Sequence, residues 1–185
     1  MRLVGLGAAL AAALLIQGCA EEHTGDRGAL EDQIFVSSAL AHAQSQLALS
    51  ELAEKKARTP AVVALAQRIA AHSAPLGDQL AEFARTSGTA PDTARTPDAA
   101  QLAALSGEAF ERAYIASQIQ DQQNALDDFT FAAERDNNPA LQKIAADALP
   151  NFKQDLADAL ETVYDIPFET GGEQDMGAGL AGRRR

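Results

Sequence analysis

The chain has 185 residues, the length of one ordinary domain with appendages. Hydrophobic residues make up 46% of it, but much of that share is the strong helix former alanine, and with only seven Phe, two Tyr and no Trp the composition predicts an all-α fold. The formal net charge of -11 argues against a nucleic-acid partner, because binding to a phosphate backbone needs clustered Lys and Arg.

The N-terminus has the features of a bacterial export signal. Arg2 is positive, and residues 3–16 form an apolar run of signal-peptide length that is short for a membrane span. The run ends in Ile16-Gln17-Gly18-Cys19, which resembles a bacterial lipoprotein box. That resemblance implies a signal peptide at 1–18, lipidation of Cys19 and anchoring through the acyl chains. The alternative is cleavage after Ala20, which would leave a soluble periplasmic protein.

The residues after the signal bear on the compartment and on stability. Ala20 follows the lipidation site, and by resemblance to proteobacterial sorting rules this favours the outer membrane. Cys19 is the only cysteine, so the mature domain contains no internal disulfide and its stability must come from packing. Residues 19–30 are polar and contain glycine, and we expect them to form a tether between the anchor and the folded domain.

Four long amphipathic helices are predicted within residues 31–165. Their expected ranges are 31–57, 60–86 with Thr59 as N-cap, 107–135 and 139–165. The second and third are separated by about twenty residues that include a short helix opened by Pro97. A link of this length favours a ferritin-like four-helix bundle with a long crossover between helices two and three. Residues 166–185 are Gly-rich, end in three Arg and are predicted to be a disordered tail.

Each long helix carries a polar side chain near its middle on the face that the apolar pattern buries. In chain order these residues are Gln46, His72, Gln122 and Asp155. On the third helix, the expected apolar stripe consists of Ile115, Ile119, Leu126, Phe129 and Ala133. A buried, unpaired amide costs about 1–3 kcal/mol, so we expect the four polar residues to form a hydrogen-bonded network that fixes the helix register. A pair between His72 and Asp155 would let each keep its charge.

Two prolines lie close to these polar residues. Pro75 is near His72 and Pro150 is near Asp155, and each removes a backbone donor and is expected to bend its helix. A sizeable apolar cavity beside these bends would point to ligand binding.

Several short elements resemble one bacterial family. The most specific are the Gly-x-x-Phe-Glu-x-x-Tyr element at 107–114 and the Leu149-Pro150 pair, with further matches at 52–56 and 62–72. Over about residues 32–160 the chain resembles domain-of-unknown-function family 4142, predicted secreted or outer-membrane proteins with a ferritin-like bundle. The resemblance implies the fold and an envelope location, and it barely constrains the function.

The resemblance also implies where members of this family place polar residues on the bundle axis. They commonly carry Glu on the first helix, Asp-His on the second, and His on the third and fourth. The corresponding residues here are Gln46, Ala71-His72, Gln122 and Asp155, so only His72 keeps the family's residue type. A di-metal centre usually uses Glu-x-x-His pairs, and this sequence contains none. His42, His72 and Asp155 remain as weak candidate ligands for one metal ion.

Motifs of nucleophilic catalysis do not occur. The only thiol is the lipidation site, and there is neither a Gly-x-Ser-x-Gly elbow nor a Gly-rich phosphate loop. We interpret Tyr114 as a packing residue of the third helix and Glu111 as a residue that forms an ion pair at the surface. We therefore expect no catalytic residue and no cofactor, and favour a non-catalytic binding or structural module of the envelope. The alternative is a metal-binding ferritin-like oxidoreductase or metal store.

Overall fold

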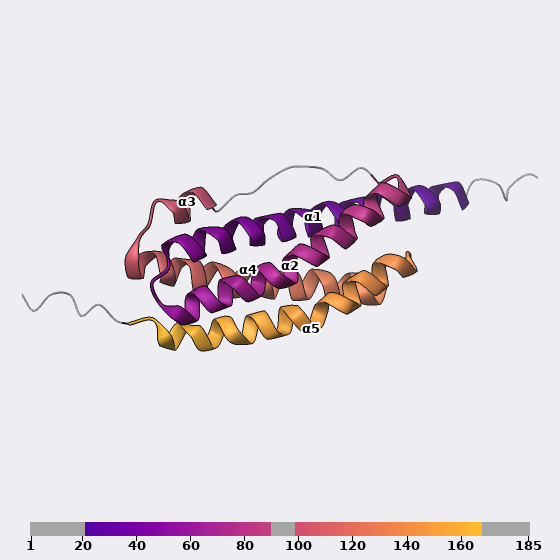
Figure 1. Cartoon of the computed structure of the whole chain (residues 1–185). Helices are drawn as coiled ribbons and strands as arrows, with labels where there is room; N and C mark the ends of the chain where they lie inside the picture. Colours follow the sequence, from indigo (N-terminus) through magenta and orange to yellow (C-terminus); the bar gives the residue numbers. More distant parts are fainter. Residues whose placement is uncertain (1–20, 90–98, 168–185) are drawn as a thin grey trace, which may run out of the picture.

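The computed structural model describes residues 21–89 and 99–167, with side chains from Arg27 onward. The described elements are α1 (Glu21–Lys56), α2 (Pro60–Ser87), α3 (Ala99–Ala103), α4 (Gly107–Arg135), α5 (Pro139–Thr162) and a 3-10 turn at Val163–Asp165. The four long helices pack as a bundle (Figure 1). The predicted all-α fold is confirmed. The predicted signal peptide and Cys19 lie outside the described residues.

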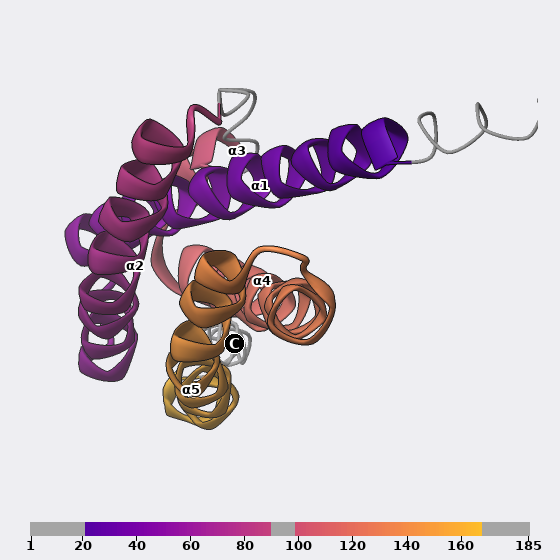
Figure 2. The same cartoon turned by 90° about the vertical axis from the view of Figure 1, so that its right-hand side faces the viewer.

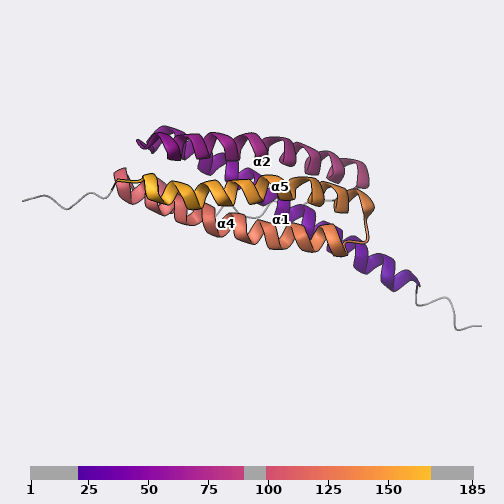
Figure 3. The same cartoon turned by 90° about the horizontal axis from the view of Figure 1, so that it is seen from below.

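The bundle consists of two helical hairpins. α1 and α2 form one antiparallel pair and α4 and α5 form the other, with α2 beside α5 and α1 beside α4 (Figures 1 and 3). α2 and α4 run in the same direction, so α2 ends and α4 begins at opposite ends of the bundle (Figure 1). The short helix α3 precedes α4 and lies against α1 (Figure 2), where Lys56 Nζ donates a 2.6 Å hydrogen bond to the Ala103 carbonyl oxygen.

The predicted starts of α2, α4 and α5 agree with the structure, because local signals determine them. α2 and α5 each begin with a proline directly after an extended residue, and at α5 the Asn138 side chain accepts from the Ala140 amide at 3.1 Å. The C-cap of α2 is Gly88, whose φ of 72° is the left-handed conformation that glycine adopts easily. The helical segment from Pro139 reaches Asp165 only with its last turn in 3-10 form.

Two predicted boundaries need correction. α1 begins at Glu21, so the residues 21–30 that we predicted as a tether are helical. Extending an existing helix costs less than starting one, so the helix can continue here even though Leu30 is 55% exposed. The predicted tail also starts too early, because Ile166 is buried against the bundle end. The rest of that tail, 168–185, lies outside the described residues.

The core has two apolar clusters, one toward each end of the bundle. The first contains Val36, Ala39, Leu40, Leu76, Leu80, Ala84, Ala125, Phe129, Ala132, Leu141, Ala145, Ala148 and Phe152. The second contains Leu49, Ala53, Val62, Leu65, Ala66, Ile69, Leu102, Phe110, Tyr114, Ile115, Ala159 and Ile166. None of the helices in the described part of the chain is long and apolar enough to cross a membrane.

Candidate functional site

A band of polar side chains separates the two apolar clusters. On every long helix the polar residues fall between a residue of one cluster and a residue of the other. We define the polar band as Gln46, His72, Ser73, Gln118, Gln122 and Asp155. Gln46, Gln122 and Asp155 are at most 2% exposed, whereas a quarter of the His72 side chain reaches solvent. The four residues predicted from sequence therefore lie at one level of the bundle.

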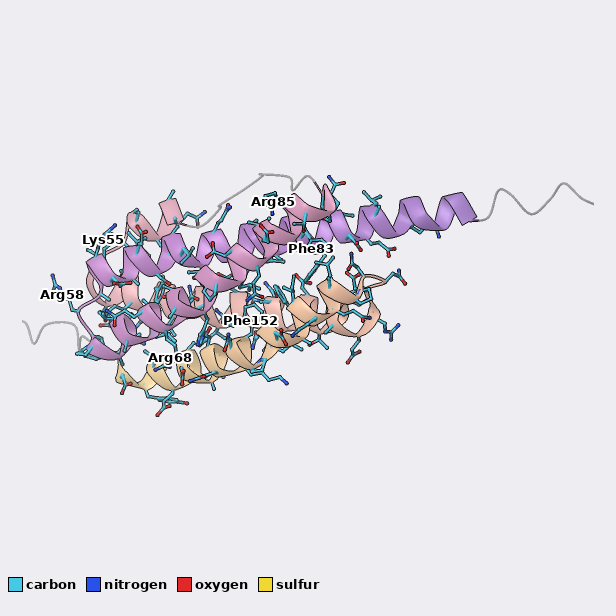
Figure 4. The ribbon with its side chains drawn as sticks, turned by 45° about the vertical axis from the view of Figure 1, so that its right-hand side comes forward. Lys55, Arg58, Arg68, Phe83, Arg85 and Phe152 are labelled. Atoms are coloured by element: carbon cyan, nitrogen blue, oxygen red, sulfur yellow. The ribbon has the colours of Figure 1, made fainter. Side chains whose placement is uncertain are left out.

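On the α2–α5 side, His72 and Asp155 form a direct pair. The His72 Nδ1 atom lies 2.9 Å and 3.0 Å from the two carboxylate oxygens of Asp155. Burial raises the pKa of Asp155 above its ordinary value, and the hydrogen bond from His72 partly offsets this rise. The predicted contact is thus present, and it ties the middle of α2 to the middle of α5. One turn away, Arg68 of α2 (labelled in Figure 4) forms an ion pair with Asp158 of α5.

On the α1–α4 side, the glutamines have other partners. Gln46 Nε2 donates to Asp121 Oδ2 at 3.2 Å. The Gln122 Oε1 atom has no hydrogen-bond partner among the described residues. Within that part of the chain, no hydrogen bond joins either glutamine to the His72–Asp155 pair. The single network that we predicted is therefore divided between two helix pairs, since the glutamines come from α1 and α4 and the pair from α2 and α5.

Further polar residues of this region were missed by the sequence analysis. Gln118 is fully buried one turn before Gln122, and Ser50 is fully buried one turn after Gln46. Tyr114 is also fully buried; its burial raises the pKa of its hydroxyl, and the approach of the Ser50 hydroxyl lowers it slightly. Gln118 was missed because the predicted apolar stripe of α4 was centred on its neighbour Ile119, which is only partly buried.

Many of these buried polar atoms lack a partner inside the described part of the protein. Eight atoms are concerned: His42 Nε2, Gln46 Oε1, Ser50 Oγ, Tyr114 Oη, Ser117 Oγ, both amide atoms of Gln118, and Gln122 Oε1. An unsatisfied buried polar group costs about 1–3 kcal/mol, so eight would cost roughly 8–24 kcal/mol if they stayed dry. A whole domain is stable by only about 5–15 kcal/mol. These atoms therefore need hydrogen-bond partners beyond the side chains that the structure describes.

A surface cleft lies between α2 and α5 beside the band. Its volume is about 70 Å³, and it is lined by His72, Ser73, Pro75, Leu76, Gln79, Ile144, Asp147, Ala148, Asn151 and Phe152. Since one water needs roughly 10–15 Å³ measured in this way, the cleft has room for several waters or a ligand of a few heavy atoms. Pro75 and the residue after Pro150 both line it, so it lies beside the two prolines, but it is small and half of its lining residues are polar, unlike the sizeable apolar cavity that we said would point to ligand binding. Phe152 is labelled in Figure 4.

The candidate metal ligands do not come together as a set. The ring of His42 lies edge-on to the ring of Phe152, with centroids 5.6 Å apart, whereas His72 contacts Asp155. Burial lowers the pKa of His42 to about 4. The described residues contain no group of three or more His, Cys, Asp or Glu that could hold a metal ion. These side chains thus do not fit the ligand set of a ferritin-like metal centre.

Glu111 has a role different from the predicted surface pairing. It is only 3% exposed, and its Oε1 atom accepts hydrogen bonds from the backbone amides of Arg58 at 2.5 Å and Thr59 at 2.8 Å. Its Oε2 atom accepts from the Thr59 hydroxyl at 2.7 Å. Thr59 precedes α2 as predicted, but its hydroxyl does not cap the helix because it donates to Glu111. The start of α4 therefore holds the turn between α1 and α2.

The structure defines a class of protein: a four-helix bundle of two hairpins whose apolar core is interrupted by a buried polar band. The family model described as "Domain of unknown function (DUF4142)" matches residues 18–162, so the chain belongs to this family. The resemblance drawn from the Gly107–Tyr114 element is thereby confirmed.

Two solved structures are similar in fold. One is the crystal structure of a DUF305 fragment from Deinococcus radiodurans, with 17% identity and a TM-score of 0.65. The other is CopM in the Cu(I)-bound form, with 20% identity and a TM-score of 0.64. Each alignment covers 72% of this chain and 95% of the other chain. At these identities the likeness concerns the fold alone. The comparison with curated proteins gives no match.

Proposed function

We propose that this protein is a lipoprotein of the bacterial cell envelope whose bundle binds a small ligand in the α2–α5 cleft without catalysing a reaction. The observation that carries the proposal is the cleft itself, which places the partly exposed His72 imidazole at the surface of the bundle between α2 and α5. Half of its lining residues are polar and half are apolar, so the cleft offers a small ligand both hydrogen bonds and apolar contact. The low volume restricts the ligand to a few heavy atoms.

We further infer that the bundle is ferritin-like in topology. Two antiparallel hairpins with α2 parallel to α4 are the arrangement that a single long crossover between helices two and three produces. The α3 segment, which lies at the opposite end of the bundle from the end of α2, supports such a crossover (Figure 1).

Binding in the cleft is testable by NMR. A library of small fragments is titrated into the ¹⁵N-labelled mature domain, and amide shifts of residues around Ser73 and Ala148 are followed. Ala148→Leu fills the cleft and is expected to abolish the shifts. Ala157→Leu is the matched control, since Ala157 is an exposed residue of α5 outside the cleft lining, and it should bind like the parent. Binding that survives Ala148→Leu, or no fragment shift at the cleft, would refute the proposal.

The envelope anchor is the second part of the proposal. It rests on the Ile16–Cys19 sequence and implies attachment to the outer membrane, with a soluble periplasmic protein as the alternative. In cells fed radiolabelled palmitate, the parent chain should be labelled and recovered with outer membranes. Cys19→Ser should lose both properties, and membrane retention of this variant would count against lipidation.

A metal-binding role has one point in its favour, the similarity of the fold to CopM, which has been seen in a Cu(I)-bound form. The residues of this chain give it no further support, because the weak candidates His42 and His72 have other contacts. Elemental analysis of the purified, tag-free protein tests the role. A stoichiometric metal that is lost on His72→Ala would replace our proposal with this one.

A further inference from the structure

The facing sides of α1 and α4 form a regular ladder of polar side chains. The two helices are antiparallel, and their register is fixed by the Phe35 and Phe129 rings, whose centroids are 5.2 Å apart. Moving along α1 by seven residues and then by four, while moving back along α4 by the same numbers, keeps side chains at the same level of the interface. Above the Phe35–Phe129 contact, this spacing places three further pairs at the same level, which we define as the polar ladder: His42 with Gln122, Gln46 with Gln118, and Ser50 with Tyr114. The approach of Ser50 to Tyr114 agrees with this register, and Gln46 bonds Asp121, which lies one turn from Gln118 on α4.

Every pair of the ladder carries buried polar atoms without a partner among the described residues. Gln46 and Gln122 each present an unpaired carbonyl oxygen, and Gln118 presents both an oxygen and an NH₂ group. The hydroxyls of Ser50 and Tyr114 and the Nε2 atom of His42 complete the set. The Ser50 hydroxyl approaches that of Tyr114, but among the described residues the unpaired amide atoms of Gln46, Gln118 and Gln122 and the His42 ring make no hydrogen bond to one another.

The chemistry of the ladder selects the kind of molecule that fits it. Donors and acceptors are mixed along its length, and burial keeps His42 neutral, so none of its six side chains is charged near neutral pH. A divalent cation is usually held by carboxylate oxygens, which the ladder lacks, and an anion would need a set of donors. Water both donates and accepts, and it commonly bridges buried polar groups that cannot reach one another.

We propose that the polar ladder is an internal binding site for a file of water molecules that joins the two hairpins. These waters bridge the glutamine amides of α1 and α4 and reach the hydroxyls of Ser50 and Tyr114. The Phe152 ring contacts the His42 ring and also lines the α2–α5 cleft, so it stands between the His42 end of the file and the cleft. The inference does not rest on ligand binding in that cleft.

The test counts long-lived internal water in the mature protein by ¹⁷O magnetic relaxation dispersion, with water–protein NOEs to the Gln118 side-chain amide as the site-specific readout. We expect a clear dispersion from the parent and NOEs from water to the Gln118 NH₂ group. Gln118→Leu should lose part of the dispersion amplitude. Gln123→Leu, on the exposed side of the same helix, is the matched control and should leave it unchanged.

Further variants keep the test decisive if Gln118→Leu fails to fold. Tyr114→Phe removes a single hydroxyl and should lose a smaller part of the amplitude. Phe152→Leu should keep the amplitude while it shortens the residence time of the waters, because it thins the barrier to the cleft. A parent protein without dispersion, or an amplitude that both Gln118→Leu and Tyr114→Phe leave unchanged, would overturn the proposal. So would a co-purified metal whose removal by EDTA changes the Gln118 resonances.

Discussion

The contact between Glu111 and the α1–α2 turn leads to a quantitative prediction. Three hydrogen bonds end on this carboxylate, and a hydrogen bond to a charged group contributes about 1.5–3 kcal/mol. Glu111→Gln keeps one oxygen but puts an NH₂ group opposite a donor, so at least one bond is lost. We expect it to lower the free energy of unfolding by about 1.5–3 kcal/mol. Glu111→Ala loses all three bonds and should lower it by about 3–5 kcal/mol.

The same contact predicts a dependence on pH. Burial alone would raise the pKa of Glu111, but the hydrogen bonds from Thr59 and Arg58 outweigh it and the pKa is lowered. A carboxyl whose pKa is lower in the folded state stabilises the fold above its unfolded pKa, and this contribution is lost as the pH falls through the folded pKa. The difference in the free energy of unfolding between the parent protein and Glu111→Gln should therefore be largest at neutral pH and should decrease in acid.

The assay is urea unfolding followed by circular dichroism from pH 7 down to pH 3. Glu134→Gln is the control, because Glu134 is an exposed acidic residue of the same helix. It should change stability by less than about 0.5 kcal/mol. If Glu111→Gln behaves like this control, or if its effect is the same at every pH, the hydrogen bonds to the turn do not stabilise the protein as argued.

Three further substitutions test other parts of the bundle. Burial lowers the pKa of His42 from 6.5 to about 4, so the unfolded chain binds the proton more tightly and stability should fall by up to about 3 kcal/mol as the pH drops through this window. His42→Leu should lack this loss in unfolding curves, and a parent-like loss would contradict a buried neutral imidazole. Asn138→Ala removes the α5 cap and should cost about 1–2 kcal/mol by chemical denaturation, whereas Asn137→Ala, at an exposed neighbour, should cost little. Phe129→Ala opens a cavity between two neighbouring rings and should cost about 3–5 kcal/mol, while the 69% exposed Phe131→Ala should be nearly neutral; equal melting temperatures for the two would disprove this account of the core.

The sequence predicted those features of the structure that are determined by residues close together in the chain. The starts of α2 and α5 follow from prolines at their first positions, and at α5 also from the Asn138 cap, which act within one helical turn. The His72–Asp155 contact was also foreseen, because both residues interrupt an apolar stripe at the middle of a helix. In contrast, the partners of Glu111 are backbone amides of a turn more than fifty positions earlier in the chain. No pattern in the sequence marks such partners, so its burial could not be foreseen.

Gln118 shows a second limit of prediction from the sequence, which concerns the buried face of a helix. An apolar stripe predicts the buried face of a helix only to within one position, because 3.6 residues per turn allow two neighbouring stripes. Ile119 and Leu126 moved the predicted face of α4 away from Gln118, although the true face passes through it. Polar residues on the buried face of a helix weaken the apolar pattern, and that pattern is what predicts the buried face from the sequence.

The polar contacts of the bundle share one geometric property. Gln46–Asp121, His72–Asp155 and Arg68–Asp158 all join one hairpin to the other, as do the bonds of Glu111 to the α1–α2 turn. The interiors of the hairpins are instead rich in alanine, whose small side chains fit equally well after a shift of one turn. Such a shift would keep much of the apolar contact but would break each of these bonds and leave its buried members unpaired. We infer that these bonds between the hairpins make one register of the two hairpins far better than its neighbours, which is the best-attested use of buried polar groups.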